Sequence, residues 1–351
     1  MKVSDLLDVT SIWSLADLDT GVKALTLSNK GTRIAAHFQG SFCDAIRIVP
    51  GHIGGLENEI AIDGGLLRNI LSVLPEEQDI TASVGKGGLR LNCAGLHEAS
   101  LRYRLGDTPP YMRRPPSLEK MELRAETMRD ALGFLQGVVV EGVAKAILTG
   151  VRFSPNAKGM LTLSATDGNA RVGVVPFPSV SMNGIEPFVS KTADLQVALD
   201  YFDTLSLACT DTHIYLSGPK TRVRLSLLKG IWPSFKTLPR EFKYKIDLSP
   251  VEVATAAKAA VYLDSNALVR LVVNKKQVSF FVEGQEMGTF LVKVGQADVG
   301  DVDILLDARW LESASRLGPM TLRYNDAKTP VLFQGTETHF TYWMSPSLKA
   351  R

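Results

Sequence analysis

An internal repeat constrains the fold of this chain more than any single motif. Three segments share one pattern of strand, lysine-containing turn, strand, short polar turn and strand, and they cover residues 23–49, 148–177 and 268–294. Apolar and polar residues alternate within each segment, as they do in half-buried antiparallel strands. The pattern predicts three copies of one antiparallel three-stranded unit.

A short amphipathic segment follows each three-stranded unit. These segments predict helices over residues 65–74, 193–205 and 308–317. In the second helix the apolar residues recur at the spacing of one buried helical face, at Leu195, Ala198, Leu199 and Phe202.

Two independent landmarks give matching offsets between the copies. The turn lysines Lys30 and Lys158 are 128 residues apart, and so are the starts of the first two predicted helices. From the second copy to the third, the lysine spacing to Lys275 is 117 residues and the helix spacing is 115. Units of this length exceed solenoid repeats of about 20–45 residues, so we interpret them as domains.

A further helix is predicted ahead of each strand unit, over residues 4–16, 124–140 and 251–263. Turn-rich stretches at residues 106–117, which hold four prolines, and 233–243 separate the copies. The predicted fold class is therefore α+β, with three similar domains over residues 1–116, 117–240 and 241–351, the first with a shortened N-terminus.

Composition excludes several classes of protein. The 351 residues are 45% hydrophobic and 22% charged with a formal net charge of +2, so disorder and a strongly charged overall surface are poor fits. Cys43, Cys93 and Cys209 lie far apart, which argues against a zinc site and a secreted disulfide framework. The N-terminus turns acidic at Asp5, and no stretch approaches about 18 uninterrupted apolar residues. We expect a cytoplasmic protein that does not enter a membrane.

The motifs of common enzyme classes are missing from the sequence. The run 85–88 (GKGG) lacks the spacing of a phosphate-binding loop and is predicted to be a hairpin turn. His97-Glu98 is not followed by the second histidine of a zinc-protease motif. Asp167, the most enzyme-like residue, precedes a glycine and is interpreted as part of a turn. We expect no catalysis, no cofactor and no metal.

Three sequence runs together resemble one known family. Residues 148–176 (LTGVRFSPNAKGMLTLSATDGNARVGVVP) resemble the middle domain of the bacterial DNA sliding clamp, the beta subunit of DNA polymerase III, where L-x-G-x-x-F and A-T-D-G-x-R-L frame a turn. Residues 232–239 (WPSFKTLP) resemble the link after that domain, and residues 342–347 (YWMSPS) resemble the Y-x-x-M-P-M ending. The resemblance covers the whole chain, because the threefold repeat is also the architecture of the family.

The resemblance implies both an assembly and a function. Three clamp-type domains, each with antiparallel sheets outside and two helices inside, would form half of a closed ring, and two chains would join head to tail as a homodimer. Such a ring is a processivity factor for DNA replication: it encircles double-stranded DNA without sequence preference and tethers the polymerase. The polymerase and the clamp loader would bind through short apolar peptide motifs.

The resemblance also implies three sets of functional residues. The partner-peptide groove would be formed by Leu148, Thr166, Gly168, Asn169, Arg171, Val172, Pro233, Leu238, Trp343, Met344, Ser345, Pro346 and Ser347. Leu148, Val172, Leu238 and Met344 are expected to form its apolar floor. The basic residues expected on the DNA-facing helices are Arg68, Arg124, Arg129, Lys191, Lys258, Arg309 and Arg316. The dimer interface would pair Leu101 and Tyr103 of a strand over residues 100–105 with Val261 and Tyr262.

The chain departs from the family pattern within the predicted groove. Arg171 is displaced by one residue in the run 169–172 (NARV), and Ser345 and Ser347 stand where apolar side chains are usual. These features predict a divergent member with an altered peptide preference. A non-catalytic scaffold that binds proteins without encircling DNA is the main alternative, because the charge balance does not demand DNA. An enzyme of nucleotide or sugar chemistry is a further alternative, which would need a convergent polar cluster.

Overall fold

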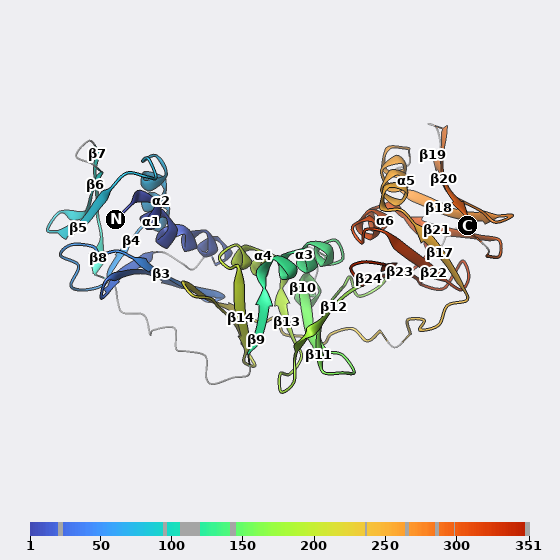
Figure 1. The fold of residues 1–351 in the computed structure, drawn as a ribbon, viewed down its shortest axis with the longest axis horizontal. Helices are drawn as coiled ribbons and strands as arrows, with labels where there is room; N and C mark the ends of the chain where they lie inside the picture. Colours follow the sequence, from blue (N-terminus) through green and yellow to red (C-terminus); the bar gives the residue numbers. More distant parts are fainter. Residues whose placement is uncertain are drawn as a thin grey trace. The chain divides into compact units, whose positions relative to one another are not determined.

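The computed structural model describes residues 1–19, 24–93, 97–105, 120–140, 145–235, 237–263, 267–284, 288–297 and 299–347. The chain divides into two compact units. Unit 1 comprises Met1–Met128 and Ala193–Leu227, and unit 2 comprises Arg129–Thr192 and Leu228–Arg351. Figure 1 shows the secondary structure elements of both units.

Unit 1 contains a nine-stranded antiparallel sheet. In spatial order its strands are β8 (Arg104–Leu105), β4 (Ile60–Ile62), β1 (Leu25–Lys30), β2 (Arg33–Gln39), β3 (Cys43–Pro50), β16 (Thr221–Ser226), β15 (His213–Ser217), β14 (Thr204–Cys209) and β9 (Met121–Arg124). Residues far apart in the sequence meet where β3 pairs with β16, with Ala45 opposite Val223. The predicted first and second domains therefore share one sheet.

Unit 1 also contains a small sheet and several helical segments. The sheet has three strands, β5 (Ile80–Gly85), β6 (Gly88–Cys93) and β7 (His97–Leu101). The helical segments are α1 (Val3–Thr10), a 3-10 helix over Ser11–Leu18, α2 (Gly64–Ser72) and α4 (Thr192–Leu199), whose first residue belongs to unit 2. Helices α1 and α2 lie side by side (Figure 1).

Unit 2 contains an eight-stranded sheet that joins the predicted second and third domains. Its strands are β13 (Phe188–Lys191), β10 (Gly150–Pro155), β11 (Met160–Thr166), β12 (Arg171–Ser181), β24 (Thr341–Met344), β23 (Val331–Gly335), β22 (Met320–Tyr324) and β17 (Tyr244–Leu248). A four-stranded sheet follows the order β20 (Gly288–Gln296), β19 (Gln277–Gly284), β18 (Leu268–Asn274) and β21 (Val302–Asp307). The helices are most of α3 (Ala125–Gln136), a 3-10 turn over Ala146–Thr149, α5 (Pro250–Leu263) and α6 (Ala308–Ser315).

The structure confirms the threefold repeat of strands and helices. The three predicted strand units are β1–β2–β3, β10–β11–β12 and β18–β19–β20, and each is antiparallel. In every copy a fourth strand returns to pair with the first, β4 with β1, β13 with β10 and β21 with β18. Helices α2, α4 and α6 then follow at equivalent places. The two units cut through the predicted second domain, because its strands are divided between two sheets.

Three predicted helices and one predicted strand were wrong in extent. The helix expected over 124–140 ends at Gln136, and Gly137 then closes a turn by donating its N–H to the Phe134 carbonyl. The helix expected over 193–205 ends at Leu199, because Phe202 closes a turn by donating its N–H to the Leu199 carbonyl and β14 begins at Thr204. The helix expected over 4–16 is α-helical only to Thr10 and continues as a 3-10 helix. The strand expected over 100–105 is interrupted between Leu101 and Arg104.

The glycine run at residues 85–88 is a hairpin turn, as the sequence predicted. Gly85 at the end of β5 pairs with Gly88 at the start of β6. Gly88 has φ +142°, and a Cβ atom there would lie 2.4 Å from the Leu101 carbonyl oxygen. The run therefore serves a tight turn packed against β7, and the linker predicted at 106–117 lies outside the described residues.

Candidate functional site

The turn between β11 and β12 is organised by the Asp167 carboxylate. Asp167 Oδ1 accepts hydrogen bonds from the backbone N–H groups of Asn169, Ala170 and Arg171 at 2.9–3.0 Å. Its Oδ2 accepts from Arg171 Nε at 2.9 Å. Thr166 Oγ1 accepts from the Gly168 N–H and donates to the Arg171 carbonyl. Asp167 is thus part of a turn, as the sequence indicated.

The environment of Asp167 favours its charged form. Burial alone raises the pKa of this carboxyl group, but hydrogen bonds from the Asn169 backbone and the Arg171 side chain and backbone outweigh it. Its pKa therefore lies below the ordinary value of 3.8.

We expect Asp167→Asn to destabilise the protein by about 2 kcal/mol at pH 7, because the variant loses the charge-assisted bond to Arg171. A group with a lowered pKa contributes stability above about pH 3.8, and this contribution is lost as the pH falls through the folded-state pKa. The difference from wild type should therefore shrink below pH 3.8. Urea unfolding followed by tryptophan fluorescence between pH 2.5 and 7 measures it, and a difference independent of pH would contradict this account.

Several predicted groove residues converge around the same turn. Gly168 has φ +80°, and a Cβ atom at this position would lie 3.0 Å from Leu148 Cδ1. Leu148 is buried with Ile147 and Val189, and Trp232 packs against this cluster. Pro233 follows directly, and both Pro233 and Leu238 are half-buried. The link after the second strand unit is therefore anchored beside Leu148.

The C-terminal strand completes this side of the turn. Val172 in β12 lies opposite Trp343 in β24, and the Ser345 N–H donates to the Ala170 carbonyl at 2.9 Å. Ser347 continues the chain by donating its N–H to the Leu305 carbonyl. The turn and the tail thus form one hydrogen-bonded surface, which we call the turn–tail surface (residues 166–172 and 343–347).

The predicted apolar floor is only partly available to a partner. Met344 is 0% exposed, and Val172 and Leu148 are 5% and 7% exposed. Because side chains alternate along a strand, Met344 faces the core with Tyr342, and Trp343 takes the other face beside Val172. Met344 therefore supports the surface from below, whereas Leu238 and Trp343 are half-buried and present part of their area to solvent.

Arg171 has partners that sequence reasoning did not find. Its Nη1 donates to the Gly137 carbonyl at 2.9 Å, and its guanidinium lies 5.2 Å from the ring centroid of Trp310. Trp310 lies on α6, and Gly137 directly follows α3. No local spacing pattern connects residues this distant in the sequence.

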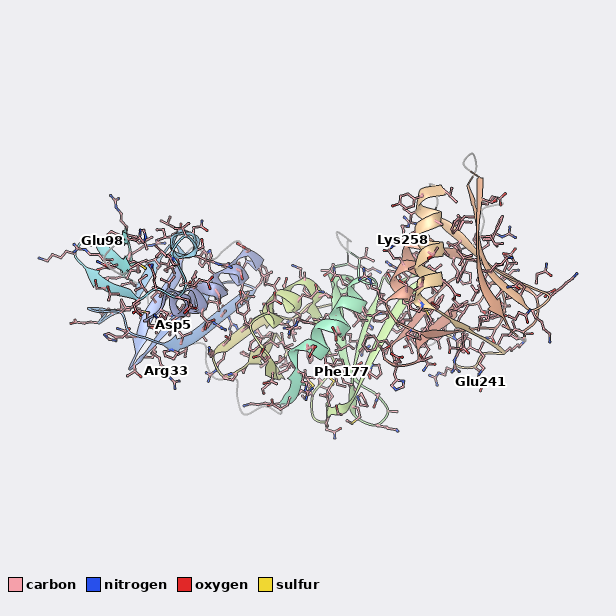
Figure 2. The ribbon with its side chains drawn as sticks, turned by 45° about the horizontal axis from the view of Figure 1, so that its top comes forward. Asp5, Arg33, Glu98, Phe177, Glu241 and Lys258 are labelled. Atoms are coloured by element: carbon pink, nitrogen blue, oxygen red, sulfur yellow. The ribbon has the colours of Figure 1, made fainter. Side chains whose placement is uncertain are left out.

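The predicted DNA-facing residues do not all lie on helices, and they are not all exposed. Arg68 on α2 and Lys258 on α5 are exposed on helix surfaces, and Figure 2 marks Lys258. Arg124 and Lys191 are exposed but end strands β9 and β13, so their predicted placement on helices was wrong. Arg129 on α3 is half-buried.

Arg309 on α6 and Arg316, which directly follows this helix, are both bonded within unit 2. Arg309 binds the Asp307 carboxylate, which caps the helix, and this pairing raises the arginine's pKa. Arg316 donates to the Gly133 carbonyl at 3.2 Å. Acidic Glu126 and Glu312 are also exposed on the helices, so both signs of charge occur there.

The predicted interface residues differ sharply in exposure. Leu101 is 3% exposed and lies opposite Leu89 in the three-stranded sheet of unit 1. Val261 and Tyr262, at the end of α5, are 53% and 81% exposed. The neighbouring edge strand β20 exposes Phe290 and Leu291, which sequence reasoning missed. We call these four exposed residues of unit 2 the α5–β20 surface.

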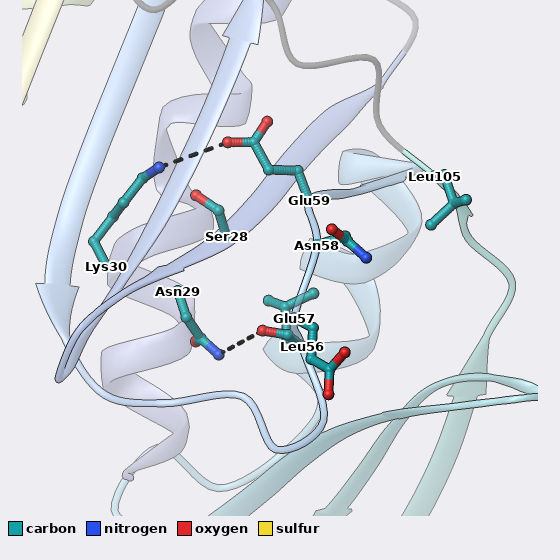
Figure 3. A pocket seen from close by; sticks show the side chains of 8 residues that line it. All are labelled: Ser28, Asn29, Lys30, Leu56, Glu57, Asn58, Glu59 and Leu105. Carbon is teal, nitrogen blue, oxygen red and sulfur yellow. Dashed lines mark hydrogen bonds and ion pairs between the residues drawn. The ribbon is translucent and has the colours of Figure 1, made fainter.

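A separate hollow of about 470 Å³ lies in unit 1, beside the end of β1 (Figure 3). Lys30 Nζ and Glu59 Oε1 face each other in it at 3.7 Å, and Asn29 Nδ2 donates to the Leu56 carbonyl. Ser28 Oγ and Glu59 Oε2 are buried there without a hydrogen-bond partner among the described residues. Within the described ranges, no cluster of three or more metal-ligating side chains occurs and no helix is long and apolar enough to cross a membrane.

Comparison with solved structures identifies the fold. No protein-family model and no curated protein matches this chain. The DNA polymerase III subunit beta from Pseudomonas aeruginosa superposes with a TM-score of 0.86 at 14% identity, covering 99% of this chain and 98% of that one. The DnaN sliding clamp from Bartonella birtlesii bound to griselimycin gives 0.84 at 16% identity, with the same coverage. The Helicobacter pylori beta clamp bound to a DNA ligase peptide gives 0.86 at 18%, covering 99% of both chains.

These similarities define a class of fold. The chain has the α+β fold of the bacterial DNA sliding clamps along its whole length, as the sequence resemblance predicted. The low identities agree with the departures seen in the sequence.

Proposed function

We propose that this chain is a DNA sliding clamp, a ring-shaped processivity factor that encircles duplex DNA and tethers a replicative polymerase and other partners. The observation that carries the proposal is the fold match over 99% of the chain. Together with the threefold repeat, it supports our proposal of three domains, at residues 1–116, 117–240 and 241–351. The proposal places the protein in the cytoplasm, with the DNA and polymerase it serves.

The proposed ring consists of two chains joined head to tail. Among the described strands, β7 and β20 each lie at the end of a sheet, so each presents an edge without a neighbouring strand there. The α5–β20 surface adds exposed apolar side chains next to one of these edges. In a closed dimer, the β7 edge of each chain would pair with the β20 edge of the other chain. The two resulting interfaces would cover all four edges. Leu101 would then support this interface from within the core, and Tyr103, Val261 and Tyr262 would lie in it.

A closed ring explains how function arises without catalysis. Topological linkage holds the protein on DNA, so tight chemical affinity is unnecessary and sliding needs weak contacts to phosphates. Exposed helix cations such as Arg68 and Lys258 supply such contacts without reading sequence. The mixed charge of the helices keeps this attraction modest.

Partner proteins would bind the turn–tail surface together with Leu148, Pro233 and Leu238. Structures with this fold carry a DNA ligase peptide in one case and griselimycin in another. We propose that short apolar peptide segments of the polymerase and clamp loader bind here through a few anchoring side chains. Trp343, Ser345 and Ser347 would then set a preference different from that of other clamps.

Reversing two helix charges tests the DNA contact. We expect Arg68→Glu with Lys258→Glu to weaken association with unrelated duplex sequences equally and to lower the salt slope of the affinity by about 1 per residue. The matched control reverses the charges of Lys158 and Lys275 by substitution with glutamate; both lysines are exposed on hairpin turns. Equal losses in both double variants, or a strong sequence preference in competition, would contradict the proposed contact.

A further inference from the structure

The side chain of Arg171 is largely buried inside unit 2. It is 14% exposed and binds three elements at once. Nε pairs with the Asp167 carboxylate in the β11–β12 turn, Nη1 donates to the Gly137 carbonyl, and the guanidinium lies over the ring of Trp310 on α6. A planar guanidinium suits this arrangement, because it can donate in its plane and stack on its face.

The Gly137 carbonyl marks a close contact between two helices. It accepts from Arg171 Nη1 and also from Ser313 Oγ at 3.3 Å. A Cβ atom at Gly137 would lie 2.7 Å from Ser313 Oγ and 3.1 Å from Ser313 Cβ, so a larger residue there would require Ser313 or the backbone to shift. A cation at the carboxyl end of a helix is favourable, since it complements the helix dipole.

The backbone of Arg171 meanwhile belongs to the turn–tail surface. Arg171 lies opposite Met344 in the β12–β24 ladder, and the preceding carbonyl, of Ala170, accepts from Ser345. One residue therefore links the surface proposed for partner binding to the ends of α3 and α6. Val172 and Trp343 lie on the opposite face of the same strands.

We propose that Arg171 is a positioning residue that holds the turn–tail surface in register with α3 and α6, and that it makes no contact with the bound partner peptide. This inference rests on the proposed function and deepens it, because it removes one cation from the peptide-reading surface. The partner segment is then recognised by apolar and backbone contacts at this point of the groove. An acidic side chain in the peptide gains nothing from Arg171.

The proposal makes Arg171 and Trp310 equivalent in their effect on peptide binding. Arg171→Gln and Trp310→Leu each loosen the same link, so each should lower peptide affinity about tenfold and the double variant no further. Arg171→Lys should behave like Arg171→Gln, because lysine keeps the charge but loses the stacked, planar geometry. Glu312→Gln, at an exposed position of α6, is the matched control and should leave affinity unchanged.

Fluorescence anisotropy with a labelled copy of the DNA ligase peptide bound by the H. pylori clamp measures these affinities at several salt concentrations. We expect the salt dependence in all variants to equal that of wild type. A flattened salt dependence in Arg171→Gln, with affinity retained in Arg171→Lys and Trp310→Leu, would show direct contact and overturn the proposal.

Hydrogen exchange provides a readout that needs no peptide. The Ser345 amide, which donates to the Ala170 carbonyl, should exchange faster in Arg171→Gln and Trp310→Leu by similar factors, and at the wild-type rate in Glu312→Gln. Unchanged Ser345 exchange in both variants would overturn the positioning role. If the wild-type protein does not bind the peptide but Ser345 exchange changes as expected, the proposed peptide-binding site is wrong and the positioning role of Arg171 is retained.

Discussion

Tyr262→Glu is expected to convert the protein from a dimer to a monomer at micromolar concentration. Tyr262 is 81% exposed at the end of α5, beside the exposed Val261 and the edge strand β20. Burying a glutamate in an apolar contact costs several kcal/mol, and a closed two-chain ring contains this contact twice. Sedimentation velocity measures the change.

Thr255→Glu provides the control for the interface experiment. Thr255 is exposed on the same helix, outside the α5–β20 surface, so this variant should remain dimeric. A wild-type monomer, or a Tyr262→Glu variant that stays dimeric, would contradict the proposed interface. Leu101 is a poor probe of it, because a core residue only 3% exposed changes folding when it is truncated.

Deleting residues 343–351 is expected to unfold the second unit. The deletion removes half of β24, which pairs with both β12 and β23, and it removes the fully buried Met344. Loss of one such side chain typically costs about 2–5 kcal/mol, and the lost ladder adds to this, against a total stability of about 5–15 kcal/mol. Circular dichroism and tryptophan fluorescence report the outcome.

A shorter truncation tests whether the last four residues are needed for the fold. Removing only residues 348–351 leaves β24 and the Ser345 and Ser347 hydrogen bonds in place, so the fold should persist. A folded 343–351 deletion with native thermal stability would contradict the burial described for this strand. Partner binding is consequently better tested by substitutions than by removal of the tail.

The strand architecture could be predicted from the sequence because its signals repeat. Alternation and the lysine turns recur three times, and β1–β3, β10–β12 and β18–β20 confirm all three copies. Helix ends were less predictable. Phe202 continues the helical spacing and is buried, yet it reaches the core from a turn after α4, so periodicity alone placed the boundary too late.

The first helix changes from an α-helix to a 3-10 helix because of hydrogen bonds made by nearby side chains. Thr10 Oγ1 donates to the Leu6 carbonyl and Ser11 Oγ to the Asp8 carbonyl, where the α-helix gives way to a 3-10 helix. Hydroxyl groups that bond to the preceding turn compete with regular helical geometry. A pattern of apolar residues carries no information about this competition.

The sequence predicted that residues of the proposed groove lie near one another, but not how their side chains are oriented. The A-T-D-G turn, Trp343 and Ser345 lie together, as the resemblance implied. Met344 was assigned to the floor although the alternation of β24 turns it toward the core. The Arg171–Trp310 contact joins residues 139 positions apart, and no sequence period could have revealed it.

Retention on circular DNA tests the central claim most directly. A clamp loaded onto closed or nicked circular duplex by its cognate loader should remain bound through gel filtration at high salt, because linkage is topological and not electrostatic. Cutting the circle once should release it, since the ring can slide off a free end. Retention that is unaffected by linearisation, or release from intact circles at the same salt concentration, would contradict encirclement.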